Sequence, residues 1–197
     1  MTAVTLIDYG AGNLRSLRAA FERLGATVET TTDAERVRRA RRLVLPGVGA
    51  AAPAMAALAG NGLSQAIAEA AAPLLGVCLG MQLLFERSLE GDVECLGLLE
   101  GSVEPITWAT QVPHMGWNDV EPAGDHALAA TLPAVCYFAH SYAVAPQGDK
   151  SVVVAQTEIG GRKVPSVVAA GRVAGVQFHP EKSGPAGRAL LTGWLRG

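Results

Sequence analysis

Cysteine is scarce in this chain, and the three that occur, Cys78, Cys95 and Cys136, cannot all pair with one another. Their spacing matches none of the C-x-x-C patterns that bind metal ions. We therefore expect a protein of the reducing cytoplasm with no metal site. Cys95 and Cys136 are interpreted as small buried hydrophobic residues.

An excess of charge and a long apolar run are also missing. The 16 basic and 18 acidic residues give a formal net charge of -2, which argues against binding to nucleic acid or to an anionic membrane. The basic run at residues 36–42 is interpreted as the solvated face of a helix. No apolar stretch reaches the roughly 20 residues of a membrane-spanning helix. The apolar run at residues 4–7 is too short for a signal peptide and is followed by Asp8.

The apolar residues that are present suffice for a core, because the chain is 49% hydrophobic and 17% charged. Its length of 197 residues predicts one domain spanning residues 1–197. Runs rich in Val, Leu and Ile at residues 4–8, 43–46 and 73–78 alternate with stretches suited to helices at 12–24 and 53–70. This alternation predicts an α/β fold with a parallel sheet buried on both faces.

The second half of the chain contains more strand-like segments and fewer helical ones than the first half. Strands are expected at residues 103–106, 117–121, 136–144, 151–158, 164–169 and 173–178, and a helix at 185–195. We therefore expect a strand-rich second half that includes antiparallel pairs.

The segment at residues 74–82 has the pattern of a nucleophile elbow. An apolar strand runs into Gly-x-Cys-x-Gly, centred on Cys78, and then into a helical pattern. Such a turn holds a nucleophile above the carboxyl edge of a sheet. The helix N-terminus favours a thiolate, and the Leu79 N–H would face a developing oxyanion. The alternative is a buried cysteine in an ordinary strand–helix turn.

A thiolate needs a base, and a base needs a group that orients it. The segment at residues 176–181 supplies both, because a strand ends at His179 and Glu181 lies two residues further on. His-x-Glu alone is equally typical of a surface histidine. Together with Cys78 it predicts a catalytic triad, provided that the fold brings the two segments together.

A third strand, at residues 43–46, ends in a glycine-rich loop. Residues 47–52 satisfy the loose dinucleotide-binding pattern. That pattern normally belongs to the first strand–helix unit and is followed by an acidic residue at the end of the next strand. In this chain the next strand ends in Gly-Val-Cys at residues 76–78, with no acidic residue. We therefore interpret the loop as a second oxyanion donor, through the Val48 N–H.

Two further loops carry polar and aromatic residues. Residues 8–13 form a strand-to-helix loop in which Asn13 is either a helix N-cap or part of the rim of a partner surface. Residues 113–118 suit the core of an interface, or a loop packed on its own domain. His126 is interpreted as a surface helix residue.

Taken together, these segments resemble the class I glutamine amidotransferases, and most closely the glutaminase subunits of imidazole glycerol phosphate synthase. The elbow and the His-Pro-Glu sequence are shared by the class, whereas Met81 and residues 113–118 and 181–183 point to these subunits. Many members have a basic residue where Gln111 stands. The matching segments are residues 8–13, 46–49, 76–82, 113–118, 140–142 and 177–183.

The resemblance implies a flavodoxin-like three-layer α/β/α fold with a mostly parallel central sheet, and no cofactor. It implies that Cys78 is the nucleophile, His179 the base and then the acid, and Glu181 the group that orients His179. The oxyanion hole is implied at Val48 and Leu79. Binding of L-glutamine is implied for Gly47, Gly49, Gln82, Ser141 and Tyr142.

The resemblance also implies a heterodimer with a (βα)8-barrel cyclase. Ammonia released from glutamine would pass through that partner to a ribonucleotide, giving imidazole glycerol phosphate for histidine biosynthesis. Partner-facing positions are implied at Asn13, Met115, Trp117, Asn118 and Lys182. The alternatives are the glutaminase of another amidotransferase, a nucleotide-binding module that uses residues 47–52, and a scaffold in which Cys78 is incidental.

Overall fold

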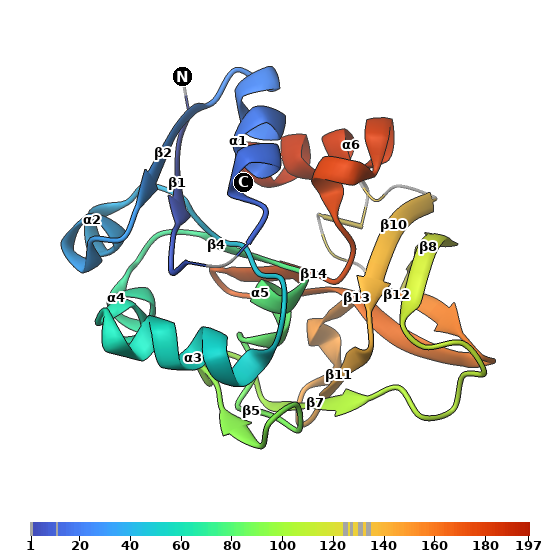
Figure 1. Ribbon diagram of the computed structural model, residues 1–197. Helices are drawn as coiled ribbons and strands as arrows, with labels where there is room; N and C mark the ends of the chain where they lie inside the picture. The colour runs from blue at the N-terminus through green and yellow to red at the C-terminus, as the bar shows by residue number, and fades with distance from the viewer. Residues whose placement is uncertain (1, 11, 124–125, 127, 130–131, 133–134) are drawn as a thin grey trace.

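A twisted sheet of eight strands forms the centre of the protein, whose computed structural model describes residues 2–10, 12–123, 126, 128–129, 132 and 135–197 (Figure 1). Five neighbouring strands run parallel in the order β2 (Thr27–Thr31), β1 (Ala3–Ile7), β3 (Leu43–Leu45), β4 (Leu74–Val77) and β14 (Val173–Val176). Three antiparallel strands extend this sheet, namely β13 (Arg162–Ala170), β12 (Val153–Ile159) and β9 (Glu121–Pro122).

Helices cover both faces of the parallel strands because side chains alternate between the faces. Val44 packs in one core with residues of α1 (Leu14–Arg23) and α6 (Gly184–Arg196). Leu43 and Leu45 pack in a second core with residues of α2 (Ala34–Arg39), α3 (Ala51–Gly60) and α4 (Leu63–Glu69). Figure 1 shows these two groups of helices on opposite sides of the sheet, so the layers are α/β/α.

Two smaller sheets come from the second half of the chain. One has the strand order β11 (Tyr142–Pro146), β7 (Gly101–Pro105), β5 (Arg87–Ser88), β6 (Val93–Glu94). The other is the antiparallel pair β10 (Val135–His140) and β8 (His114–Asp119), which lies on the right of Figure 1. Short helical turns are found at α5 (Leu79–Gln82), η2 (Lys150–Val152) and η3 (Pro180–Lys182).

Several predicted elements differ from the observed ones in the first half of the chain. The helix expected over residues 53–70 is two helices, because Gly62 adopts φ 66° between α3 and α4. The basic run lies only partly on α2, which ends at Arg39, and Arg42 instead stacks on Trp194 of α6. Strand β2 was not predicted, since its sequence TVETT has a single aliphatic residue.

In the second half, the strand expected over residues 136–144 is two strands that join different sheets on either side of Ser141. The loop expected over residues 113–118 is largely strand β8, which includes Gly116 at φ 130°. His126 is exposed but lies outside any helix. Among the described residues, no helix is long and apolar enough to cross a lipid bilayer.

Candidate active site

Strands β4 and β14 bring Cys78 and His179 together. Cys78 directly follows β4, and His179 follows β14 by three residues. The two strands are parallel neighbours with Val77 opposite Val176, and the Cys78 N–H donates to the Val176 carbonyl. Because parallel strands end at the same edge of a sheet, both side chains lie at the carboxyl edge.

The backbone at Cys78 has the strained geometry of a nucleophile elbow. Cys78 adopts φ 55° and ψ −114°, a rare conformation for a residue with a side chain. The turn is tight enough that a Cβ on Gly80 would lie 1.9 Å from the Leu45 carbonyl oxygen, and a Cβ on Gly76 2.6 Å from the Gly80 oxygen. The flanking glycines are therefore required by close packing of α5 against β3 and β4.

Three side chains form a connected group at this turn. The Cys78 thiol lies beside the His179 imidazole in the lining of one cavity, and its charge helps to raise the pKa of His179. The His179 Nδ1 lies 3.0 Å from Glu181 Oε1, which also accepts a hydrogen bond from Asn13 Nδ2 at 3.0 Å. The side chains of His179 and Glu181 are 4% and 0% exposed, so water does not compete for these contacts. This arrangement can activate a thiol and return a proton to a leaving group.

A cavity of about 310 Å³ opens above Cys78. Its volume suits a small metabolite of the size of an amino acid. Besides Cys78 and His179, it is lined by Val48, Gly49, Leu79, Gln82, Glu90, Pro113, Met115, Ala139, His140, Ser141, Tyr142 and Lys182. The expected oxyanion and glutamine-binding residues therefore lie around one cavity, except Gly47, which lies beneath it against Leu79 and Gly80.

A model of the glutamine amidotransferase class-I family matches residues 5–195. This chain belongs to the class I glutamine amidotransferases. Solved structures share the fold at low sequence identity. A crystal structure of a glutamine amidotransferase has a TM-score of 0.75 at 21% identity and covers 98% of this chain and 97% of its own. The structure of PurLQS from Thermotoga maritima has a TM-score of 0.77 at 20% identity, with 99% and 98% covered. The predicted fold is confirmed.

Proteins with higher sequence identity to this chain carry a more specific name within the class. Imidazole glycerol phosphate synthase subunit HisH of Xanthomonas axonopodis pv. citri is 49% identical over 199 residues, which cover 99% of this chain and 98% of the relative. The subunit of the same name from Idiomarina loihiensis is 44% identical over 193 residues, which cover 98% and 96%. The resemblance found in the sequence motifs is confirmed.

Four residues around the amidotransferase site were not singled out from the sequence. The Tyr9 hydroxyl donates to the Pro46 carbonyl at 2.9 Å and supports the glycine-rich loop from behind. Glu90 lines the cavity and accepts from the Ala51 N–H at the start of α3. Gln177 lies 3.8 Å from the Cys78 sulfur through its Nε2, and His140 lines the cavity. Tyr9 and Gln177 follow parallel strands, a signal that could have identified them.

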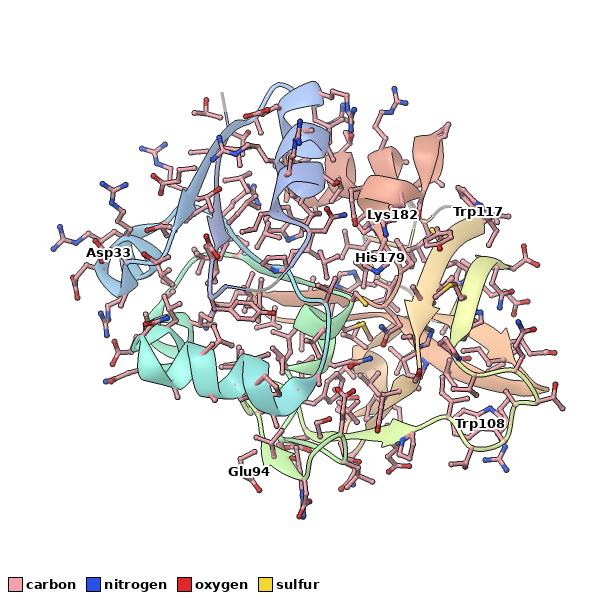
Figure 2. All side chains as sticks on the ribbon, in the orientation of Figure 1. Asp33, Glu94, Trp108, Trp117, His179 and Lys182 are labelled. Atoms are coloured by element: carbon pink, nitrogen blue, oxygen red, sulfur yellow. The ribbon has the colours of Figure 1, made fainter. Side chains whose placement is uncertain are left out.

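The residues expected to face a partner divide into two groups. Met115 and Trp117 are 61% and 60% exposed on the outer side of β8, and Lys182 lies over the Tyr137 ring, which also contacts Trp117. Figure 2 shows Trp117 and Lys182 at the same end of the molecule, above His179. Asn13 and Asn118 instead make internal hydrogen bonds and are only half-exposed.

The stability of this amidotransferase is expected to fall as the pH rises from about 6.5 to about 9. Burial lowers the pKa of His179, but hydrogen bonds and negative charge at Cys78 and Glu181 outweigh burial and raise it to about 9. A group whose pKa is raised by folding stabilises fully below its unfolded pKa, about 6.5, and loses that contribution as the pH passes its folded pKa. The free energy of unfolding should fall by at most about 1.4 kcal/mol per pH unit.

Urea unfolding at pH 6, 7.5 and 9 measures this slope. His179→Gln serves as the control, because the difference between the two proteins isolates this imidazole from other titrating groups. Equal slopes in parent and variant would show that His179 has an ordinary pKa.

Proposed function

We propose that this chain is the glutaminase subunit of an imidazole glycerol phosphate synthase, releasing ammonia from L-glutamine for a partner subunit. The observation that carries the proposal is that Cys78 and the hydrogen-bonded His179–Glu181 pair meet at one cavity of amino-acid size. A thiol held at a strained elbow beside a buried imidazole is the arrangement of a cysteine nucleophile.

The reaction proceeds in two halves. In the first, the Cys78 thiolate attacks the side-chain amide carbon of glutamine, and the tetrahedral oxyanion is held by the N–H groups of Val48 and Leu79. Collapse breaks the C–N bond, and the imidazolium of His179 gives its proton to the leaving nitrogen, which departs as ammonia. In the second, His179 takes a proton from water, whose oxygen attacks the thioester, and glutamate leaves as Cys78 is regenerated.

Charged groups around the cavity match a zwitterionic amino acid. The Glu90 carboxylate lies where it can accept from an α-ammonium group, and the positively charged Lys182 also lines the cavity. Gln82 uses its Nε2 for hydrogen bonds to Tyr142 O and Gln177 Oε1, so its own carbonyl oxygen is the part that faces the ligand. Gly49, Ser141 and Tyr142 supply backbone groups around the substrate.

The partner is a (βα)8-barrel cyclase that docks on the exposed side of β8. The relatives that this chain matches over nearly their whole length are named as subunits of imidazole glycerol phosphate synthase. Exposed Met115 and Trp117 beside the cavity give an aromatic and apolar interface core, and Lys182 adds a charge. Ammonia then passes from the cavity into the partner, in the cytoplasm, without entering bulk water.

The test is to co-express the chain with a (βα)8-barrel cyclase from a synthase of this type and to measure glutamate release. We expect co-purification, together with glutamate release that rises when the cyclase binds its ribonucleotide. A complex that forms without hydrolysing glutamine would overturn the catalytic proposal. Hydrolysis with no complex would instead favour another class I amidotransferase. Binding of a dinucleotide at the loop of residues 47–52 would favour the nucleotide-binding alternative.

A further inference from the structure

Two histidines outside the triad lie in contact between strands β8 and β10. His114 and His140 are direct cross-strand partners, and His114 Nδ1 lies 2.8 Å from His140 Nε2. His140 is 7% exposed and lines the cavity, whereas His114 is half-buried. Neither residue has a part in the triad, so their pairing needs its own explanation.

The direction of the hydrogen bonds is fixed at the His140 end. His140 Nδ1 lies 2.7 Å from the Tyr142 carbonyl oxygen, which can only accept. Burial, together with the nearby His114 and His179, outweighs the hydrogen bond to the Tyr142 carbonyl and lowers the pKa of His140 to about 4, so the ring is neutral at pH 7. With the proton on Nδ1, His140 Nε2 is an acceptor.

The acceptor at His140 Nε2 in turn determines which nitrogen of His114 is protonated and how the Asn118 amide is oriented. Because His140 Nε2 accepts, His114 Nδ1 must carry a proton and donate. Burial lowers the pKa of His114 as well, so its Nε2 is an acceptor, and Asn118 Nδ2 lies 3.0 Å from it. Asn118 Nδ2 also donates to the Glu158 carbonyl of β12 at 2.9 Å, while its Oδ1 accepts from the Asp119 N–H at 2.8 Å. The amide therefore cannot turn over without losing the bonds to Glu158 and Asp119 as well as the bond to His114.

The chain of hydrogen bonds ends in the proposed glutamine site. The Tyr142 carbonyl that accepts from His140 also accepts from Gln82 Nε2 at 3.1 Å. Gln82 Nε2 donates in turn to Gln177 Oε1 at 3.0 Å. The turn at Ser141 and Tyr142, where the chain passes from one small sheet to another, is thus fastened to the main sheet through side chains.

We propose that Asn118, His114 and His140 form a one-directional hydrogen-bond relay that positions the Tyr142 carbonyl and Gln82 for glutamine. His114 and His140 are then positioning residues of the site, an inference whose kinetic part rests on the proposed glutaminase function. The relay requires both neutral rings to carry their proton on Nδ1. A free neutral histidine carries its proton mainly on Nε2, so protonated Nδ1 in both rings distinguishes the relay from unconstrained histidines.

The first experiment measures tautomers in the unaltered chain. Histidine labelled with ¹⁵N and two-bond proton–nitrogen spectra at pH 7.5 assign the protonated nitrogen of each ring. We expect protonated Nδ1 in both His114 and His140. An Nε2–H form or a charged ring at either position would overturn the relay, whatever the protein catalyses.

The second experiment, on the complex with the cyclase, tests whether His114 acts through its hydrogen bond or only through the size of its side chain. His114→Leu and His114→Asn have nearly the same shape, but only asparagine retains a donor where Nδ1 stood. We expect His114→Leu to raise KM for glutamine about tenfold with kcat within about twofold, and His114→Asn to restore KM to within about threefold. The control Glu121→Gln alters an exposed ion pair between β9 and Lys163 of β13 and should leave both constants unchanged.

Equal KM values for the leucine and asparagine variants would overturn the relay, since shape alone would then explain the site. If the parent complex fails to hydrolyse glutamine, the proposed function is wrong, and the tautomer measurement still decides whether the relay exists.

Discussion

Cys78→Ala is expected to lower kcat for glutamine hydrolysis by at least about 10,000-fold, the scale seen when a nucleophile is removed from a catalytic triad. No other described thiol lies in the cavity, because Cys95 and Cys136 are placed elsewhere. Steady-state release of glutamate in the complex with the cyclase measures the loss. Mass spectrometry after treatment with an alkylating glutamine analogue should find one added group in the parent, on Cys78.

Cys95→Ala is the matched control for this experiment. Burial raises the pKa of the Cys95 thiol to about 11 and that of Cys136 to about 12, so both remain protonated and poorly nucleophilic at neutral pH. The control should keep its activity and its labelling at Cys78. Substantial turnover by Cys78→Ala, or labelling at another cysteine, would mean that the elbow cysteine is incidental.

Glu181→Gln should lower kcat by about 1,000- to 10,000-fold with little change in KM. Glu181 Oε1 accepts from both His179 and Asn13, and a neutral amide would hold the imidazole without stabilising its charged form. The pKa of His179 should fall, since the negative charge of Glu181 contributes to raising it. Steady-state kinetics and the pH dependence of unfolding check the two effects.

Asn13→Ala provides the comparison, because it removes one neutral donor from the same carboxylate oxygen and leaves the His179 contact in place. We expect a loss of about tenfold or less from this variant. If Glu181→Gln retains activity within about tenfold of the parent, the carboxylate does not orient His179.

The chemistry of the site could be inferred from short local patterns. Gly-x-Cys-x-Gly after an apolar strand predicts the elbow, because only glycines tolerate the close contacts now seen at Gly76 and Gly80. Periodicity also predicted the parallel strands β1, β3 and β4, whose aliphatic residues are buried on both faces. Strand β2 was not predicted because its sequence TVETT contains a single aliphatic residue.

Local sequence failed where a residue's partner lies far away in the chain. Residues 113–118 were interpreted as a loop that carries polar and aromatic residues, yet pairing with β10 makes most of them strand β8. Asn13 was interpreted as an N-cap or a rim residue, but its amide reaches Glu181, 168 residues away in the chain, and makes no capping bond with its side chain. Each outcome depends on a neighbour that no local window contains.

The sequence by itself determined the chemical groups and the turns that hold them: a thiol at a glycine-flanked elbow, an imidazole two residues before a carboxylate, and aliphatic strands able to form a buried parallel sheet. Tertiary structure decided that β14 lies beside β4, which places His179 against Cys78 across 101 residues of chain. It also decided that His114 faces His140. The physical reason is that strand order and cross-strand register arise from the packing of whole faces, which depends on every element of the fold at once.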